Sequence, residues 1–394
     1  MKTLIKNGRI ITPDRISEGA LVLEGGKIAG ILPLGAELPS DAEVIDAEGN
    51  YVSPGFIDMH THGAGGADFM DGTLEAYRTA ARMHARHGTT LLFPTTLTST
   101  NEQLFETFDI YHEAASRPSP DGAALGGLHL EGPYFAPSQK GAQDPRYLRN
   151  PEPKEYMEIL SRTDEIARWS LAPELPGALE FARVLRERGI QVSMAHTDAT
   201  FEEAEAAFRA GFTHLTHFYS CMSTVTRRNA YRYAGVIEFG YYEDGVTAEI
   251  IGDGIHVPKS LIKLIYKLKG PKRLALVTDS MRAAGMPEGP SILGGLADGQ
   301  EVLVEDGVAK LMDRSAFAGS VATDDRCVRT MVQIGEIPLR EAVRMMTLTP
   351  AEIMGVASSK GSLEKGKDAD IAIFDEGINV KRTMVAGRTV WAAR

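Results

Sequence analysis

The sequence predicts an α/β fold: a (β/α)8 TIM-like barrel with a small β-sandwich domain formed by both chain termini. Two observations support this prediction. Both ends of the 394-residue chain consist of short strands separated by Gly and Pro turns, whereas the long middle alternates apolar runs with helical segments. A doubly wound open sheet is the competing fold. The middle has eight apolar runs and no glycine-rich nucleotide loop, which favours the barrel.

The two chain ends share one strand-and-turn pattern. The N-terminal end contains "TLIKNGRIIT", "GALVLEGGKIAGIL" and "AEVIDAEGNYVSPG", and the C-terminal end contains "ADIAIFDEGI" and "VKRTMVAGRTVWAAR". Two β-rich ends around a different middle indicate one small sheet built from both, with two unrelated β-appendages as the alternative. We therefore expect a small β-rich domain of residues 1–53 and 360–394, and a barrel domain of residues 54–359.

Short apolar, β-rich runs follow one another through the middle of the chain. They are "GFIDMHTHG", "TTLLFPTTLT", "LGGLHLEGP", "ARWSLAPEL", "IQVSMAHTD", "THLTHFY", "VTAEIIGDGIHV" and "LALVTDSM". Between most of them lie segments with apolar spacing near 3.6, such as "TLEAYRTAARMHARHG" and "FEEAEAAFRAG". Thr200 and Glu203 form a capping box before the second of these segments, and Gly211 stands where its helix should stop.

Composition limits the class of protein. The chain is 43% hydrophobic and 24% charged, as in ordinary globular proteins, and its net charge of -11 argues against a nucleic-acid partner. The two cysteines, Cys221 and Cys327, form no disulfide framework, which fits a reducing compartment. No apolar run reaches the length of a membrane span, and the N-terminus lacks the apolar core of a signal peptide. We expect a cytoplasmic protein without membrane or nucleic-acid partners.

Nearly every apolar run of the middle ends in a residue capable of chemistry. Active sites of barrels lie at the C-terminal ends of the strands, and polar groups in such core positions are costly unless paired. In "FIDMHTHGAGG", His60 and His62 are two residues apart, so both imidazoles point to one face of the strand. The full set is His60, His62, Glu131, Glu174, His196, His217, His256 and Asp279.

The remaining histidines are assigned other positions. His214 and His217 are three residues apart, which places them on opposite faces of a strand. We take His217, nearer the strand end, for the site and expect His214 to pack against the outer helices. His129, two residues before Glu131, is expected in the core or beside the ligands. Three further histidines fall on predicted helices and are expected to be solvated: His84, His87 and His112.

Four of the histidines at the strand ends, together with two carboxylates, make a nitrogen and oxygen ligand set without thiolate. This set suits Zn²⁺, or Fe²⁺ or Mn²⁺, and six ligands are too many for one catalytic ion with an open position. A two-metal site with Glu131 bridging accommodates them, so we expect one or two divalent ions per chain. Asp279, on the last strand, is placed to move a proton. The six ligands are His60, His62, Glu131, His196, His217 and Asp279.

Several motifs, in this order, resemble the amidohydrolase superfamily and, within it, the N-acetylglucosamine-6-phosphate deacetylase family. They are "PGFIDMHTHG", "HLEGPYFAPSQKGA", "AHTDAT", "THLTHFYSCM", "DGIHV", "LVTDSM" and "AFAGS". The resemblance covers essentially the whole chain. It implies a metal-dependent hydrolase that removes acetate from N-acetylglucosamine-6-phosphate to give glucosamine-6-phosphate, a small β-domain assembled from both ends, and a homodimer.

The resemblance also implies a role for each site residue. Glu131, His196 and His217 would hold the main metal, and His60 and His62, which some members lack, would hold a second one. In addition, Asp279 would be the catalytic acid and base, and His256 would polarise the amide carbonyl and bind substrate.

Three departures from the family pattern concern the substrate. Gln143 stands where the family usually has a histidine, and Ser220 and Cys221 replace an asparagine and an alanine that help hold the sugar. The loop "STVTRRNAYRYAG" is longer than usual. In it, Arg228 aligns best with the arginine that reaches the substrate phosphate from a neighbouring subunit.

Other loop residues and other functions stay open. Arg227 and Arg232 are near enough to compete with Arg228 for the phosphate. Tyr231 and Tyr233 suggest a packed loop, one that reaches across a subunit interface. One alternative function is hydrolysis of another amide, such as an unphosphorylated acetamido sugar, N-acetylgalactosamine-6-phosphate or an N-acyl amino acid. A non-enzymic binding protein on the same fold is the remote alternative, since no metal ligand is missing.

Overall fold

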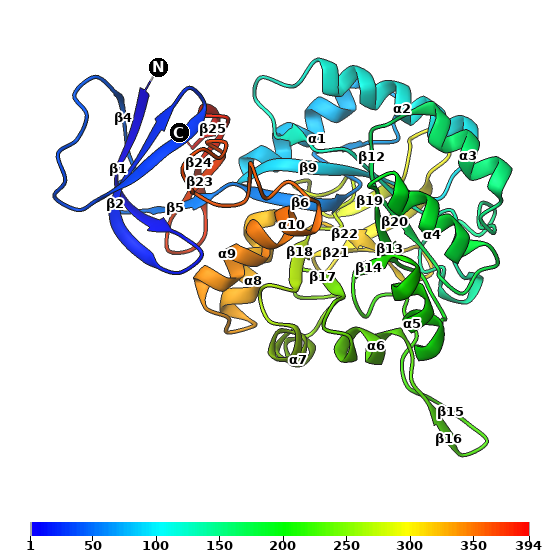
Figure 1. Cartoon of the computed structure of the whole chain (residues 1–394). Helices are drawn as coiled ribbons and strands as arrows, with labels where there is room; N and C mark the ends of the chain where they lie inside the picture. Colours follow the sequence, from blue (N-terminus) through cyan, green and yellow to red (C-terminus); the bar gives the residue numbers. More distant parts are fainter. Residues whose placement is uncertain (1, 394) are drawn as a thin grey trace.

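The computed structural model describes residues 2–393 and shows a barrel with a small β-domain at one side (Figure 1). The small domain is one hydrogen-bonded sheet in the order β25-β24-β23-β5-β1-β2-β3, with β4 paired to β1. Its strands are β1 (Lys2–Ile11), β2 (Ile16–Glu24), β3 (Lys27–Pro33), β4 (Glu43–Asp46), β5 (Tyr51–Pro54), β23 (Ile371–Phe374), β24 (Val380–Val385) and β25 (Arg388–Ala392).

The two chain ends meet where β5 pairs antiparallel with β23, with Val52 opposite Ile373. Both side chains belong to a hydrophobic cluster of the small domain that also includes Ile5 and Leu21. Alternating apolar residues of the N-terminal hairpins therefore find their partners on strands from the other end of the chain. The predicted terminal β-domain is confirmed, while its limits at 53/54 and 359/360 stay predictions.

Each of the eight apolar runs predicted for the middle forms a parallel strand. They are β6 (Phe56–Thr61), β9 (Thr89–Thr96), β11 (Leu128–Glu131), β12 (Ile166–Leu171), β13 (Gln191–Met194), β14 (Phe212–Leu215), β17 (Thr247–Ile251) and β18 (Leu274–Val277). Neighbours in this list are hydrogen-bonded. The barrel closes where Asp279 N–H donates to the His60 carbonyl (2.9 Å) and Thr61 bridges Ser280. The predicted barrel is confirmed.

Helices cover the outside of the barrel (Figure 1). They are α1 (Leu74–Arg86), α2 (Asn101–Ser116), α3 (Pro153–Arg162), α4 (Ala178–Glu187), α5 (Phe201–Ala210), α6 (Val236–Tyr242), α7 (Lys259–Lys269), α8 (Asp324–Gln333), α9 (Leu339–Met345) and α10 (Leu348–Ile353). A short 3-10 helix, η1 (Pro137–Gln139), lies instead in the loop after β11, beside His196. The capping box of α5 forms as predicted, because Glu203 N–H donates to Thr200 Oγ1 and Thr200 N–H donates to the Glu203 carboxylate. Within the described chain, no helix combines the length and hydropathy needed to cross a membrane.

Two β-elements at the mouth of the barrel were not predicted. A four-stranded antiparallel sheet follows β18, and a hairpin between α5 and α6 projects away from the body of the molecule (Figure 1). The strands of the sheet are β19 (Gly289–Leu293), β20 (Gln300–Glu305), β21 (Val308–Leu311) and β22 (Phe317–Ser320), and those of the hairpin are β15 (Thr226–Arg228) and β16 (Tyr231–Tyr233). Three minor strands complete the set: β7 (Gly63–Ala64), β8 (Ala67–Asp68) and β10 (Ala124–Leu125).

Candidate active site

A cavity of about 220 Å³ opens at the C-terminal ends of the barrel strands. Its walls combine the strand ends with Leu293 and Phe317 from the β19–β22 sheet, which covers one side of the opening. Most of the residues predicted for the site line it. They are His62, Glu131, Gln143, His196, His217, Ser220, Cys221, His256 and Asp279.

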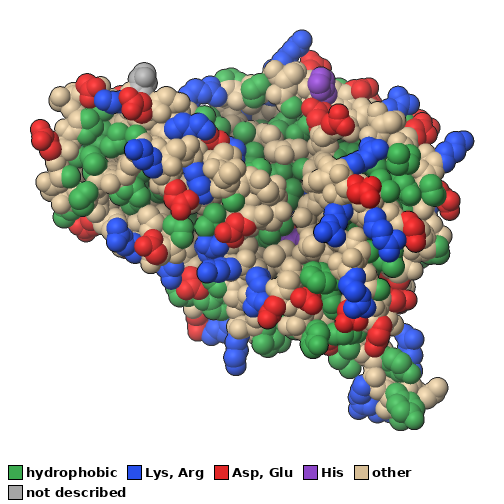
Figure 2. All heavy atoms as spheres, viewed as in Figure 1, with side chains coloured by type: hydrophobic (Ala, Val, Ile, Leu, Met, Phe, Trp, Pro, Cys, Tyr) green, Lys and Arg blue, Asp and Glu red, His purple; other side chains and the backbone are tan. Residues whose placement is uncertain are grey.

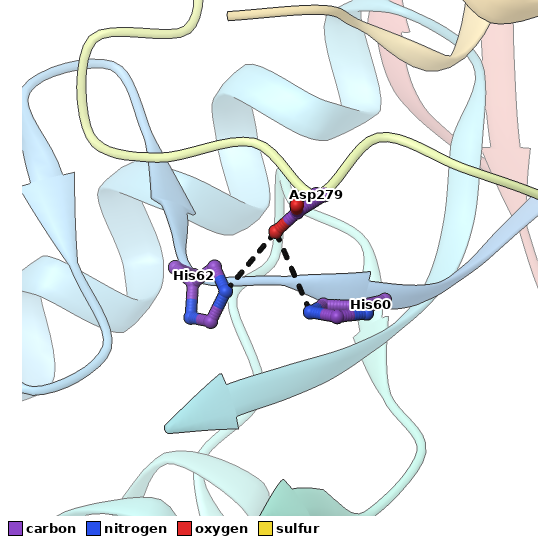
Figure 3. A group of neighbouring side chains, drawn as sticks. All are labelled: His60, His62 and Asp279. Carbon is purple, nitrogen blue, oxygen red and sulfur yellow. Dashed lines mark ion pairs between the residues drawn. The ribbon is translucent and has the colours of Figure 1, made fainter. Parts of the chain in front are cut away.

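Two groups of potential metal ligands meet at this cavity. The first is His60 and His62, at the end of β6, with Asp279, just after β18. Figure 3 shows both imidazoles directed toward the Asp279 carboxylate, with His62 Nε2 at 3.1 Å and His60 Nε2 at 3.4 Å from Asp279 Oδ1. All three side chains are buried. His60 on β6 and His62, one residue past its end, thus point to the same side, as the sequence predicted.

The second group is centred on Glu131, at the end of β11. Its Oε1 lies 2.9 Å from His217 Nε2 and 3.4 Å from His196 Nε2. The same carboxylate also reaches the first group, at 3.6 Å from His60 Nε2 and 3.5 Å from His62 Nε2. Glu131 therefore lies between the two groups, where a bridging ligand has to be.

Three of the six candidate ligands have a left-handed backbone. The φ angles are 45° at His196, 29° at His217 and 47° at Asp279. Such angles are uncommon for residues other than glycine and store strain that often marks functional sites. Each residue lies just beyond a strand, so the turn away from the strand aims its side chain into the cavity.

The ring nitrogens show that the donors fit a metal ion. His62 Nδ1 donates to the Thr95 carbonyl at 3.2 Å, and His196 Nδ1 donates to the Gln139 carbonyl at 2.8 Å, which leaves each Nε2 on the cavity side. His60 Nε2 is buried and makes no hydrogen bond. A neutral imidazole with a fixed Nδ1–H and a free Nε2 is the form that ligates divalent ions.

The electrostatics of the cluster also favour a bound cation. Burial alone would lower the pKa of His60, but Asp279, Glu131 and Glu249 raise it to about 10. Burial alone would raise the pKa of Glu131, whereas the imidazoles around it, that of His60 first, hold it well below its usual range. The carboxylates thus retain protons on nearby imidazoles, and a divalent ion would replace those protons.

His256 has a fixed orientation at the cavity wall. Its Nδ1 donates to Asp253 Oδ2 at 2.7 Å, and its ring packs against Phe317 with centroids 4.7 Å apart. The other ring nitrogen is therefore the one available for a substrate. This is the arrangement expected of a group that donates a hydrogen bond to a carbonyl oxygen.

Gln143 contacts the ligand cluster through its amide. The Nε2 group donates to Glu131 Oε2 at 2.8 Å, and Oε1 accepts from the Thr98 N–H at 3.0 Å. The sequence assigned Gln143 to substrate binding, but in the structure both ends of its amide already have protein partners. The side chain is buried and holds the central carboxylate in place.

Cys221 and Ser220 form the side of the cavity next to His196. A Cβ atom at Gly141 would lie 2.7 Å from Cys221 Sγ, and Gly141 has a φ of 55°, so only glycine fits at this wall. Both Ser220 and Cys221 are partly exposed to the cavity, as their assignment to the substrate requires.

Arg228 lies on the projecting hairpin rather than in the cavity of its own chain. Its guanidinium packs 5.6 Å from the Tyr233 ring centroid, and both residues are exposed. Within one chain this loop is not packed, since Tyr231 is 73% exposed and Tyr233 43%, and its packing across a subunit interface stays a prediction. Figure 2 shows basic and apolar side chains together on this projection. Among residues 2–393, those that line the cavity include neither Lys nor Arg.

The predicted position of His214 is wrong. His214 lies inside the barrel, where its Nε2 donates to Glu249 Oε2 at 3.1 Å and its Nδ1 contacts Thr247 Oγ1 at 2.8 Å. The expected alternation between His214 and His217 fails because β14 ends at Leu215 and His217 has a left-handed backbone.

Two of the histidines on helices also differ from the prediction. His84 is buried, with Nε2 at 3.0 Å from Thr61 Oγ1, because this face of α1 packs on the barrel. Burial lowers the pKa of His84 to about 3. His87 is partly buried against Asp325 at 3.1 Å, and only His112 is exposed as expected.

Glu174, and a third group made of Asp58, His84 and Asp324, have structural roles. Glu174 accepts from Thr197 Oγ1 and from the Asp198 N–H, both at 2.6 Å, and does not line the cavity. Asp58, which lies near His84 and Asp324, accepts from the His60 N–H at 3.3 Å and from Thr278 Oγ1 at 2.5 Å. Asp58 thus fixes the strand that carries His60.

Two charged residues inside the barrel were missed. Arg168 on β12 and Glu249 on β17 are fully buried and form an ion pair of 2.6 Å beneath the cavity. The signal was present in the sequence, because "IARWSL" and "TAEII" each hold one charge inside an apolar strand. Such charges need a partner, which the sequence alone does not identify.

Comparison with known proteins places the chain in a family. The family model described as "Amidohydrolase family" matches residues 51–390. The chain is 36% identical to the N-acetylglucosamine-6-phosphate deacetylase of Lysinibacillus sphaericus, over 87% of this chain and 86% of that protein. It is 32% identical to the N-acetylgalactosamine-6-phosphate deacetylase of Escherichia coli O157:H7, over 98% and 99%.

Solved structures agree with the sequence matches. The N-acetylglucosamine-6-phosphate deacetylase of Pasteurella multocida superposes with a TM-score of 0.92 at 31% identity, covering 100% of both chains. A variant of the Mycobacterium smegmatis enzyme, in complex with N-acetyl-D-glucosamine-6-phosphate, gives a TM-score of 0.90 at 29% identity over 99% of both chains. The chain therefore belongs to the amidohydrolase family, in the group of the N-acetylglucosamine-6-phosphate deacetylases.

Proposed function

We propose that this protein is a metal-dependent hydrolase that converts N-acetylglucosamine-6-phosphate and water to glucosamine-6-phosphate and acetate. The observation that supports this most directly is the position of Glu131 between two ligand groups at the mouth of the barrel, beside Asp279 and His256. Its relatives over most of the chain are deacetylases of N-acetylated amino sugar 6-phosphates.

The ligand set indicates the cofactor. Nitrogen and oxygen donors suit Zn²⁺ best, with Fe²⁺ or Mn²⁺ as alternatives, and the two groups provide for two ions per chain. A bound divalent ion makes water acidic enough to act as a nucleophile near neutral pH and polarises the amide carbonyl. Elemental analysis of the purified protein should find one to two divalent ions per chain. Full activity of metal-free protein would contradict the proposal.

Asp279 and His256 carry out the proton transfer and charge stabilisation. Asp279 accepts the proton of the attacking water and then delivers it to the sugar nitrogen as the C–N bond breaks. His256, held through Nδ1 by Asp253, donates from its other nitrogen to the carbonyl oxygen as negative charge develops there. The products are the free amine of the sugar and acetate.

Within one chain, the substrate phosphate lacks a basic partner, because the described residues that line the cavity include neither Lys nor Arg. We propose that Arg228 binds it from a second copy of the chain in a homodimer, because the hairpin carries Arg228 away from the body of its own chain. A planar guanidinium forms charge-assisted hydrogen bonds that suit a phosphate. Arg227 and Arg232 on the same hairpin are the competitors.

Steady-state kinetics on phosphorylated and unphosphorylated acetamido sugars test the substrate. Arg228→Ala should raise KM for the 6-phosphate by about one to two orders of magnitude, since such hydrogen bonds are worth roughly 1.5–3 kcal/mol. The unphosphorylated sugar should be barely affected. Arg232→Ala on the opposite strand is measured in parallel, and a loss confined to the 6-phosphate in that variant would assign the phosphate to Arg232 instead. Equal losses on both sugars, or none on either, would instead favour another amide substrate.

A second candidate substrate is N-acetylgalactosamine-6-phosphate. A relative of that activity matches 98% of the chain, and the residues that differ from the usual pattern, Gln143, Ser220 and Cys221, all line the sugar cavity. The ratio of kcat/KM for the two epimeric 6-phosphates decides between them. A cytoplasmic location remains part of the proposal and rests on the two free cysteines, Cys221 and Cys327.

A further inference from the structure

We propose that Glu249 is a positioning residue that holds the His60 ring in the orientation needed for the second metal ion, with Arg168 holding the Glu249 carboxylate in place. The inference rests on the proposed metal-dependent function. Glu249 is fully buried in the middle of β17, below the cavity floor. Its Oε1 accepts from His60 Nδ1 at 2.8 Å, and its Oε2 accepts from Arg168 Nη1 at 2.6 Å.

The contact with Glu249 decides which nitrogen of His60 faces the ligands. When Nδ1–H donates to the carboxylate, the lone pair of Nε2 points toward Asp279 and Glu131, at 3.4 and 3.6 Å from their oxygens. Nε2 is buried without a hydrogen-bond partner. A partner on the far nitrogen fixes the tautomer and the ring orientation of a metal-ligating histidine, and a carboxylate makes that ligand more basic.

The other three ligand histidines lack such support in the described chain. His62 and His196 donate Nδ1–H to backbone carbonyls, and Nδ1 of His217 is buried without a partner. A carbonyl is a weaker acceptor than a carboxylate. The strongest hydrogen bond to a ligand histidine from outside the cluster is therefore the one to His60. This residue belongs to the group of His60, His62 and Asp279, which would hold the second metal ion.

Arg168 is the ion-pair partner of the buried Glu249 carboxylate. A buried charge is costly unless its partner has good geometry and further hydrogen bonds. Besides Glu249, Arg168 donates to Ser193 Oγ at 3.0 Å and to Thr216 Oγ1 at 2.8 Å. It also donates to the Met59 carbonyl, next to His60, at 3.3 Å. Groups on β6 and β13, together with Thr216 just after β14, thus hold the guanidinium that contacts Glu249.

Glu249 also contacts the other ligand group, but less directly. Its Oε1 accepts from the backbone N–H of His217 at 3.2 Å, where the backbone is left-handed. This bond supports the turn that carries His217, whereas the bond to His60 acts on the ligand ring itself. Loss of Glu249 should therefore weaken the site of His60, His62 and Asp279 more than that of Glu131, His196 and His217.

Metal titration of the full-length protein tests the inference without using activity. The protein is stripped with a chelator and equilibrated with increasing free Zn²⁺, and bound zinc per chain is measured. Wild type should bind two ions. Glu249→Gln should weaken one of them by about 10- to 100-fold, as for other outer contacts of metal ligands, and leave the other within a few-fold. Ser193→Ala is the matched control: it removes a buried hydroxyl that hydrogen-bonds to Arg168 but leaves the guanidinium its bonds to Glu249, Thr216 and Met59, so both ions should bind within a few-fold of wild type.

A second variant separates positioning from folding. Glu249→Gln leaves Arg168 as an unpaired buried charge, so the double variant Glu249→Gln/Arg168→Met removes both charges together. Thermal unfolding checks that it folds, and it should show the same loss of one ion. His60→Ala identifies the ion that the Glu249 variants weaken, because removal of the His60 ligand should weaken the same ion.

Three results would overturn the inference. They are a folded double variant that binds both ions as wild type does, equal weakening of both ions, and a wild type that binds fewer than two. A wild type that binds two ions but deacetylates none of the sugars would instead fault the proposed function and leave the role of Glu249 standing.

Discussion

Replacing Asp279 by asparagine tests the proton transfer at the centre of the proposed reaction. Asparagine keeps the size of the side chain and one oxygen, but it neither accepts a proton from water nor returns one to a leaving amine. In the structure the Asp279 carboxylate is 10% exposed and its Oδ1 lies 3.1 Å from His62 Nε2. Bulk water has little access to replace it.

The size of the expected loss follows from the role. A positioned general acid or base contributes about 10²- to 10⁴-fold, which corresponds to roughly 3–5 kcal/mol of transition-state stabilisation. Asp279→Asn should therefore lower kcat by on the order of 10² or more with N-acetylglucosamine-6-phosphate. The KM should change much less, because the carboxylate acts on the water and the leaving nitrogen rather than on the sugar ring.

Asp279 is also a candidate ligand, and the assay has to separate the two roles. Steady-state rates are measured with metal saturating, and bound metal per chain is measured on the same samples. Full metal content with a large fall in kcat would support proton transfer. A kcat near that of wild type at saturating metal would refute it, and if activity is low only below saturation, Asp279 is a ligand alone.

Three further outcomes are expected. His256→Asn should lower kcat more than it raises KM, because its hydrogen bond strengthens as charge develops on the carbonyl oxygen; a change in KM alone would make it a binding residue. Gln143→Leu should lower the free energy of unfolding in urea by about 1–3 kcal/mol, since the Thr98 N–H and the Glu131 carboxylate each lose their partner. Burial and the charge of Asp58 raise the pKa of Asp324 well above its usual value. The folded state therefore binds the proton of the Asp324 carboxyl more tightly than the unfolded chain does, and the protein loses stability as pH rises above about 4. Asp324→Asn should therefore raise Tm more at pH 8 than at pH 5 in a thermal unfolding series, and an equal shift at both would contradict the reasoning.

The strand ends explain why much of the site was predictable. Polar groups in buried strands are costly unless paired, so apolar runs that finish on His60, Glu131 or His196 are unusual. The barrel brings the ends of such strands to one rim. The prediction needed only the parallel arrangement. It did not need the side-chain geometry, which the left-handed turns at His196 and Asp279 supply.

Features that depend on tertiary contacts were not predictable. Alternation along a strand failed at His214 because β14 is shorter than its apolar run. The partners of Arg168 and Glu249 come from strands far apart in sequence, so neither residue reveals its role alone. The predicted contact of Gln143 with the sugar came from the family pattern, whereas its contact with Glu131 depends on the loop after β11 folding back.

The pairing of β5 with β23 has a consequence for biosynthesis. About three hundred residues separate the two strands, and at roughly 5–20 residues per second a ribosome needs on the order of 15–60 s to make them. During that time the N-terminal hairpins have emerged, but β5 presents an unpaired edge and the apolar face around Val52 lacks the side chains of Ile371 and Ile373. The edge of β5 therefore stays open in the nascent chain until β23 has been made and pairs with it. Proteins truncated before residue 371 should accumulate as aggregates rather than as free barrels.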